Sequence, residues 1–339
     1  MQLGPGILYA FAMILGAAAM NGAYGIPLRF MKKWNWENAW AAWTVVSMML
    51  LPSLAAWLSI RGLVPAYSHT GLTSFAEMGA FGALWGIGVL MIGMSFPMVG
   101  VAIGNAIALG CAATLGSLLP LLGRQSGKLG TTAGNLILAG IAVMLGGVAI
   151  CGAAGKERER RQGAAVSEKG KAKAGAIVAG IGGSLTSALN IAFAYGDPIL
   201  DEVRLRNPGS AMVANALWVP ILMAGALPGL LYCGWLMRKN RSVKTYWVAE
   251  SAGYWPLVLC MAALWFGSVL LYGAGAVRIG SLGPVVGWPV FMSGAVIFSF
   301  AWSALAGEWK RSGGKAVGLM IIGISLLISA LLLFGRAGS

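Results

Sequence analysis

Residues 83–100 read "ALWGIGVLMIGMSFPMVG", and residues 263–280 read "ALWFGSVLLYGAGAVRIG". Both stretches begin with Ala-Leu-Trp, and both carry a glycine eight residues after the tryptophan and another glycine seven residues further on. The offset between them is 180 residues throughout, without a gap. Self-similarity at a fixed offset is the sequence signature of a repeated architecture. The two stretches therefore predict that the chain contains the same structural unit twice.

Two shorter pairs of segments support the same duplication. "AYGIP" at 23–27 returns as "AYGDP" at 194–198, and "ENAW" at 37–40 returns loosely as "ANALW" at 214–218. Chance resemblance in a chain rich in Gly, Ala and Leu explains any single pair, but it is the poorer explanation for three pairs in the same order. We expect a first unit over 1–154, a charged linker over 155–174 and a second unit over 175–339.

The amino-acid composition indicates whether these units lie in water or in a lipid bilayer. Of the 339 residues 58% are hydrophobic and only 10% are charged, whereas soluble domains contain roughly 25% charged residues. Glycine occupies 51 positions, and small residues allow helices to pack closely within a lipid bilayer. This balance predicts an integral membrane protein with the lipid bilayer as its surroundings.

A helix needs about 20 mostly apolar residues to cross a bilayer. An odd number of crossings returns the chain on the opposite side, so a second five-helix unit is upside down relative to the first. The predicted fold is therefore all-α integral membrane, with ten transmembrane helices in two inverted five-helix repeats, an arrangement typical of secondary transporters. The ten spans are expected near residues 5–28, 38–60, 73–94, 97–122, 130–154, 175–195, 210–236, 252–274, 281–306 and 314–335.

Basic residues predict the orientation. The loops after the odd-numbered spans hold 17 of the 24 Lys and Arg, and cytoplasmic loops of membrane proteins carry the excess of these residues. We therefore expect residues 155–174 in the cytoplasm and both termini outside. The Lys and Arg that give the net charge of +14 lie mostly in these short loops, where they set the orientation in the membrane. No nucleic-acid partner is therefore expected.

The duplicated Ala-Tyr-Gly-x-Pro segment is expected to end the first helix of each repeat, at opposite faces of the membrane. Gly and Pro weaken backbone pairing there, which suits a gate. The second copy differs from the first by Asp197.

Polar and aromatic residues inside the apolar runs are the candidates for a binding site. Such residues usually face the interior of a helix bundle, and inverted repeats place the substrate site near the membrane midplane. A tryptophan ring fits the C–H face of a sugar and an asparagine amide bonds its hydroxyls, so the two residue types suit an uncharged polyhydroxyl ligand. The alternative for each residue taken singly is packing or an interhelical hydrogen bond. The predicted substrate-binding residues are Asn21, Tyr24, Trp85, Asn105, Asn190, Tyr195, Trp218 and Trp288.

Enzyme chemistry finds no support in the sequence. The single histidine, His69, falls in a predicted loop, and no carboxylate pair, Cys–His set or phosphate-binding loop is present. We expect no catalytic residues, no cofactor and no metal.

Four segments resemble the L-rhamnose–proton symporter family, which belongs to the drug/metabolite transporter superfamily. They are "KKWNWENAW" (32–40), "GALWGIGVLMIG" (82–93), "GPVVGWPVFMS" (283–293) and "GEWK" (307–310), and the similarity extends over essentially the whole chain. The resemblance implies a bacterial inner-membrane transporter with ten helices that takes up a small neutral sugar, L-rhamnose or a related deoxy-sugar, together with a proton.

A proton-coupled transporter needs a group that changes charge during the cycle. The candidates are Glu37, at a helix start near two lysines, Glu77, a few residues into its span, and Asp197, in the second Ala-Tyr-Gly-x-Pro segment. We favour Asp197. Two alternatives to sugar uptake stay open: a transporter or exporter of another small metabolite on the same fold, and a non-transporting membrane scaffold or receptor.

Overall fold

The computed structural model describes residues 5–163 and 169–338. Within these residues every regular element is helical and no strand occurs. Nine stretches there are long and apolar enough to cross a membrane, and the longest, Ala249–Leu305, contains two helices that run in opposite directions. The all-α integral membrane fold is therefore confirmed.

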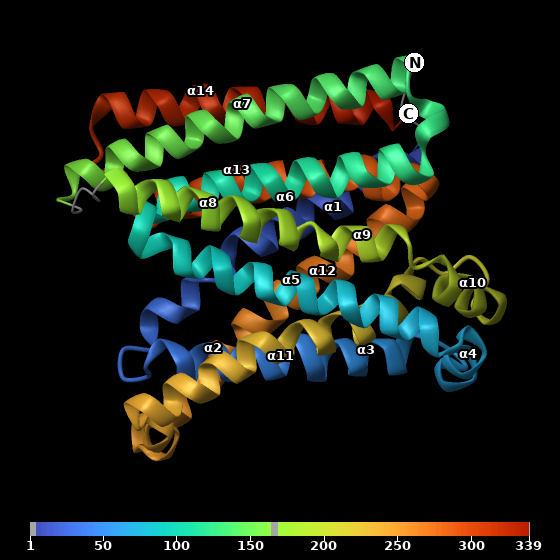
Figure 1. Ribbon diagram of the computed structural model, residues 1–339, viewed down its shortest axis with the longest axis horizontal. Coiled ribbons are helices and arrows are strands. Elements are labelled where there is room, and N and C mark those ends of the chain that lie inside the picture. Colours follow the sequence, from blue (N-terminus) through green and yellow to red (C-terminus); the bar gives the residue numbers. More distant parts are fainter. Residues whose placement is uncertain (1–4, 164–168, 339) are drawn as a thin grey trace.

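Successive long helices run in alternating directions along one axis (Figure 1). The elements of the first half are α1 (Pro5–Ala23), η1 (Ile26–Phe30), α2 (Trp36–Thr44), η2 (Val45–Leu50), α3 (Leu51–Ser59), α4 (Leu63–Thr70), α5 (Leu72–Val99), α6 (Val101–Arg124), η3 (Ser126–Lys128) and α7 (Thr132–Arg161). The elements that follow are α8 (Lys169–Thr186), α9 (Ala188–Ala194), α10 (Asp197–Arg206), η4 (Ala211–Ala214), α11 (Asn215–Asn240), η5 (Ser242–Trp247), η6 (Ala249–Tyr254), α12 (Trp255–Ile279), η7 (Gly280–Leu282), η8 (Gly283–Gly287), α13 (Trp288–Leu305) and α14 (Gly313–Ala337). Each of the ten predicted spans overlaps one of these long helices or an end-to-end series of them.

The two ends of the bundle differ in charge. The end that we call the termini end carries the start of α1 and the end of α14 together with α4 and α10 (Figure 1). The opposite end, the basic end, carries the segment 26–35, the end of α7, the start of α8, the end of α11 with η5, and the segment 306–315. Together these parts include 17 of the 24 Lys and Arg. The structure thus brings the basic loops to one side of the bundle.

The Ala-Tyr-Gly-x-Pro segments break the chain in the same way at opposite ends of the bundle. Helix α1 ends at Ala23 at the basic end, and α9 ends at Ala194 at the termini end. In each copy the tyrosine and glycine form the break, and a new helical element begins with proline in its first turn. Proline is well tolerated there because the first N–H groups of a helix have no intrahelical partner.

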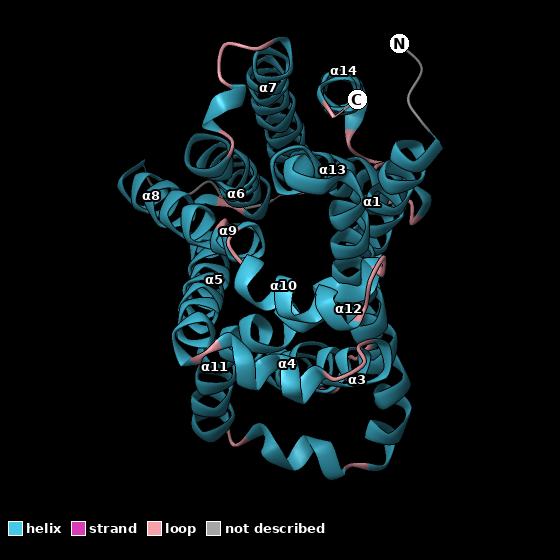
Figure 2. Cartoon of the chain, turned by 90° about the vertical axis from the view of Figure 1, so that its right-hand side faces the viewer, coloured by secondary structure: helices cyan, strands magenta, loops and turns pink. Residues whose placement is uncertain are grey.

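The helices pack in groups that combine both halves of the chain. Helix α1 lies along α12 and α13, and α8 lies along α5 and α6. Helices α7 and α14 form a pair at one edge of the bundle, and α11 packs on α2, α3 and α5 at the other side (Figure 2).

Two predicted boundaries were wrong. The turn between the third and fourth spans lies at Gly100, where φ is +88°, and not at 95–97, because Pro97 is accommodated inside α5. The helices on either side extend beyond the predicted spans into the segment 155–174: α7 continues to Arg161, and α8 begins at Lys169. The charged end of α7 stays helical because Glu157 pairs with Arg160 and Arg161 one turn later.

Candidate substrate cavity

A cavity opens at the basic end between α1, α6, α7 and α13. It encloses about 530 Å³, within the range of small-molecule sites. Asn21 comes from the last turn of α1, Tyr24 from the break that follows it, and Asn105 from the start of α6. Ser299 and Ser303 of α13 add hydroxyl groups to the opposite wall. The cavity therefore combines amide, hydroxyl and aromatic groups.

Charged residues surround the mouth of this cavity. Glu308, in the turn after α13, forms ion pairs with Arg29 of η1 and with Arg158 of α7, the second at 3.3 Å. The Arg158 guanidinium also lies 5.0 Å from the centre of the Trp309 ring. Glu159 accepts a hydrogen bond of 2.9 Å from the Ala102 amide, so its negative charge lies at the N-terminus of α6, where the helix dipole favours it.

A second hollow, the vestibule, lies at the termini end. It encloses about 380 Å³ and is lined by charged residues, Arg124, Asp197 and Arg204, and by apolar residues that include Phe193 and Pro284. Arg124 at the end of α6 binds Asp197 at the start of α10, with 2.5 Å between the Nη2 and Oδ2 atoms, and also donates to the Ala194 carbonyl. The ion pair therefore fixes the break between α9 and α10.

A closed layer of buried polar contacts lies between the two hollows, and we call it the septum. At its centre the Asn190 amide donates to the Gly116 carbonyl at 2.7 Å and to the Pro284 carbonyl at 2.9 Å, and it accepts from the Tyr272 hydroxyl. Ser117 donates to the Val285 carbonyl at 2.5 Å. The Trp288 indole N–H donates to the Ala112 carbonyl at 3.0 Å. The septum connects α6, α9, α12, η8 and the start of α13.

Prolines explain why main-chain carbonyls are free for these contacts. In an α-helix the Gly116 carbonyl would accept from residue 120, which is Pro120 and has no N–H. Val285 stands in the same relation to Pro289, and Pro284 precedes Pro289 by the five-residue spacing of the π-helix η8. Each carbonyl needs a partner, since a buried unsatisfied group costs about 1–3 kcal/mol. Side chains of neighbouring helices supply these partners, as is usual for proline in membrane helices.

The structure brings the eight predicted binding residues to four places and not to a single cavity. Asn21, Tyr24 and Asn105 line the basic-end cavity, where Asn21 also donates to Ser268 at 3.3 Å and Tyr24 stacks on Trp43. Asn190 and Trp288 lie in the septum.

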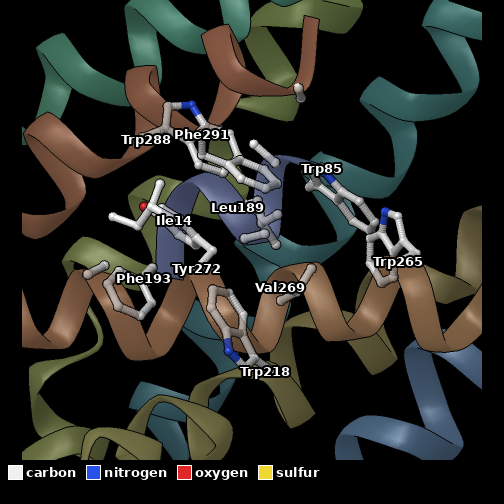
Figure 3. Packing of buried hydrophobic residues seen from close by; sticks show 14 of the residues in the cluster. Ile14, Trp85, Leu189, Phe193, Trp218, Trp265, Val269, Tyr272, Trp288 and Phe291 are labelled. Carbon is white, nitrogen blue, oxygen red and sulfur yellow. The ribbon is translucent and has the colours of Figure 1, made fainter. Parts of the chain in front are cut away.

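Trp85 and Trp218 belong to an aromatic core near the septum (Figure 3). Trp85 packs against Trp265, its counterpart at the 180-residue offset, with ring centres 5.9 Å apart. Trp218 stacks on Phe193 at 5.3 Å, and its indole N–H has no hydrogen-bond partner among the residues that the structure describes. Both rings are buried, so this arrangement provides packing.

Tyr195 lies apart from the other predicted residues. The residue is 38% exposed, and its ring centre lies 5.2 Å from the Arg124 guanidinium. With Phe81 and Leu119 it borders a separate hollow. It faces the outside of the bundle at the termini end and does not reach the basic-end cavity.

The three candidate carboxylates lie far apart in the fold. Glu37 is buried in the first turn of α2 and accepts from Asn240 at 2.9 Å and from Ser242 at 2.8 Å. Lys33 does not bind Glu37; it binds Glu250 at 2.7 Å, and this contact raises the pKa of Lys33. Glu77 is exposed near the start of α5, and Asp197 faces the vestibule with a side chain that is 42% exposed.

Sequence reasoning missed several residues of these sites. Tyr272 and Ser117 complete the septum, Arg124 binds Asp197, and Glu308 and Arg158 stand at the mouth of the cavity. The prolines at 120 and 289 were the available signal for the septum, because each frees a carbonyl four residues earlier that requires a donor.

Comparison with known proteins gives a consistent result over the whole chain. The family profile described as "L-rhamnose-proton symport protein (RhaT)" matches residues 5–337. The chain is 30% identical over 332 residues to a protein of Yersinia pestis (strain Pestoides F) named "L-rhamnose-proton symporter", with 94% of this chain and 96% of the relative covered. A protein of the same name from Yersinia pseudotuberculosis serotype O:3 (strain YPIII) has the same identity and coverage. With its buried septum between two hollows and its match from end to end, this chain belongs to the L-rhamnose–proton symporter family.

Proposed function

We propose that this protein is a secondary transporter, not an enzyme, that takes up L-rhamnose or a related deoxy-sugar together with a proton. The observation that carries the proposal is the pair of hollows, one at each end of the bundle, with a closed septum between them. Alternating access requires such a barrier, which must close one side while the other is open. The family match and the names of the relatives supply the substrate and the coupling ion.

The sugar is expected to bind in the basic-end cavity. Asn21 and Asn105 offer amides to hydroxyl groups, Tyr24 and Trp309 offer ring surfaces, and the volume of about 530 Å³ accommodates a monosaccharide with water. Asn190 and Trp288 would meet the sugar when the septum opens. Trp85 and Trp218 are proposed to support transport by packing in the buried aromatic core. Tyr195 is proposed to act at the termini end, where its ring lies beside Arg124.

Two inverted repeats, over 1–154 and 175–339, explain the symmetry of the contacts. Asn38 at the start of the second span donates to the Ser242 carbonyl just after the seventh, and Asn215 at the start of the seventh donates to the Ser59 hydroxyl at the end of the second. The group of α1 with α12 and α13 corresponds to the group of α8 with α5 and α6. Gly100 and Gly280, 180 residues apart, both have positive φ and both follow the third helix of their half.

Asp197 is the proposed coupling residue. It binds Arg124 and lines the vestibule, so protonation would release the guanidinium and loosen the break between α9 and α10. Glu37 is held by neutral donors inside the bundle and Glu77 is exposed at the edge, so both are less suited to linking a proton to the septum.

The membrane setting follows from the charges. We propose a location in the bacterial inner membrane with the basic end in the cytoplasm and both termini outside, since cytoplasmic segments carry the excess of Lys and Arg. In this orientation the vestibule faces the outside and the sugar cavity opens to the cytoplasm.

The test is transport by the purified protein in proteoliposomes. A pH gradient, acid on the vestibule side, should drive accumulation of labelled L-rhamnose, and a protonophore should abolish it. D-glucose, which is not a deoxy-sugar, serves as the control substrate. Uptake without accumulation would indicate a uniporter; efflux of apolar compounds without sugar uptake would favour an exporter, and absence of both would favour a scaffold or receptor.

A further inference from the structure

We propose that Asn190 is a positioning residue for transport, the side chain that holds the septum closed between the vestibule and the basic-end cavity. The proposal rests on the proposed function only in taking the protein to be a transporter, whatever its substrate. Sequence reasoning placed Asn190 among the sugar ligands; its contacts indicate a gate.

The reach of the Asn190 amide is the first argument. Its two N–H groups point to carbonyls of different helices: Gly116 lies in α6, which packs with α8 and α5, and Pro284 lies in η8, next to α12 and α13. Helix α6 also packs directly on η8 and α13, so the amide lies at the contact between the two groups. The amide oxygen accepts from Tyr272 of α12. One fully buried side chain thus joins the two helix groups whose relative movement would open a passage.

The nature of its acceptors is the second argument. The Gly116 carbonyl has no helical N–H four residues later, because residue 120 is proline, and the Pro284 carbonyl meets Pro289 at the π-helical spacing. When the septum opens, the hydrogen bonds between the Asn190 amide and these two carbonyls break at the same time. The carbonyls and the amide then need water or the hydroxyl groups of a substrate, because bare polar groups are costly in an apolar interior. Opening is therefore tied to the entry of a polar, hydrogen-bonding ligand.

The position of the septum is the third argument. Pro284 and Phe193, the latter one turn after Asn190, line the vestibule. On the other side, Leu109 lines the basic-end cavity and lies one turn before Ala112, the acceptor of the Trp288 indole. A probe placed at Leu109 therefore reports whether solvent crosses the septum (Figure 3 shows Trp288, Tyr272 and Phe193 around this region).

The experiment measures labelling of Leu109→Cys from the vestibule side in the full-length protein. The four native cysteines are first replaced by alanine, the protein is kept in membranes of established orientation, and an impermeant thiol reagent is added on the vestibule side alone. We expect slow labelling with Asn190 present. Asn190→Ala should raise the rate by about tenfold or more, because three hydrogen bonds that hold the septum are lost together. Asn190→Asp keeps an acceptor for Tyr272 but can donate to at most one of the two carbonyls, and only when it is protonated, so it should also raise the rate.

Asn215→Ala is the matched control. Asn215 is also buried and donates to Ser59 at 2.9 Å, but it lies outside the septum, so its removal should leave the labelling rate within about twofold of the parent. An equal rise in both variants would mean general loosening and would overturn the proposal. So would an unchanged rate in Asn190→Ala and Asn190→Asp.

Two milder variants keep the proposal testable if Asn190→Ala does not fold. Tyr272→Phe removes one of the three bonds and Ser117→Ala removes the neighbouring bond to Val285, so each should raise the labelling rate by a smaller factor. No rise in either would contradict the proposal. Because labelling needs no sugar, failure of L-rhamnose transport and failure of the gate are observed separately.

Discussion

Asn105 stands at the start of α6 with its side chain exposed to the basic-end cavity, across from α13. Within the part of the chain that the structure describes, this amide makes no hydrogen bond to the protein, so it is available to a ligand in the cavity. Asn190 has the same side chain, but all its hydrogen-bonding groups are used within the septum. The surroundings, and not the residue type, decide which asparagine is free to bind a ligand.

Asn105→Leu is predicted to raise the KM for L-rhamnose by about tenfold, since an unpaired ligand hydroxyl loses roughly 1–3 kcal/mol. The variant should fold normally because the side chain is exposed. Asn135→Leu, an exposed asparagine on α7 outside the cavity, is the matched control and should leave the KM unchanged. Initial rates of uptake in proteoliposomes measure both, and a normal KM in Asn105→Leu would remove this residue from the site.

Asp197→Asn is predicted to keep sugar exchange but to lose accumulation driven by a pH gradient. The substitution removes the carboxylate that binds Arg124. The asparagine amide that takes its place cannot bind a proton. Asp201→Asn is the control, because Asp201 lies on the same helix and also pairs with an arginine, Arg204, but does not itself line the vestibule or contact Arg124. Counterflow and gradient-driven uptake are measured on the same preparations. Accumulation that persists in Asp197→Asn would show that another group carries the proton.

At the scale of elements, close helix packing depends on glycine at defined positions. Helices α5 and α11 approach so closely that a Cβ atom on Gly82 would lie 2.1 Å from the Ile221 carbonyl oxygen. One turn earlier on α5, a Cβ on Gly79 would meet only the Ala224 methyl at 3.8 Å. In a bilayer the hydrophobic effect gives no preference for helix contact, so small residues and close packing hold the helices together.

Gly82→Ala is therefore predicted to lower the thermal stability of the purified protein, since overpacking costs about 1–3 kcal/mol. Gly79→Ala is the paired control: it gains the same helix propensity, about 1 kcal/mol, without the clash, and should leave stability unchanged or raise it. Thermal unfolding in detergent compares the two. Equal effects of the two substitutions would argue against close contact of α5 with α11.

At the scale of the whole molecule, charge is separated between the ends of the bundle. The basic end contains 17 of the 24 Lys and Arg, most of them in the last turns of α7 and α11, the first turns of α8, and the segments 26–35 and 306–315; the termini end contains the start of α1 and the end of α14. This separation predicts the orientation of the protein in the membrane, with the vestibule outside and the cavity open to the cytoplasm.

The topology is predicted to place Ser126 outside and Lys171 in the cytoplasm. In the cysteine-free background, Ser126→Cys should react with an impermeant thiol reagent added to intact cells, whereas Lys171→Cys should react only after the membrane is opened. Both residues are exposed in the structure, so burial does not distinguish them. The reverse pattern would invert the orientation and with it the roles of the two hollows.

Features that depend on local composition could be predicted from the sequence. Apolar runs of about 20 residues specify membrane helices wherever they occur, and the Ala-Tyr-Gly-x-Pro segments end a helix in both copies because Gly and Pro act on their own backbone. The membrane class and the relatedness of the first and second copies of these segments could therefore be predicted without coordinates. Boundaries were less certain: Pro97 lies inside α5, and the charged end of α7 remains helical.

The distribution of the polar residues depends on how distant helices pack and could not be read from local sequence. Asn21, Asn105 and Asn190 all lie in apolar runs, yet two of them line a cavity and the third closes the septum. Their roles depend on which carbonyls and hydroxyls other helices bring near, and the contacts of Asn190 lie 74 to 94 residues away in the chain. Helix identity is fixed by interactions within about one turn, whereas a cavity or a gate exists only where distant helices meet.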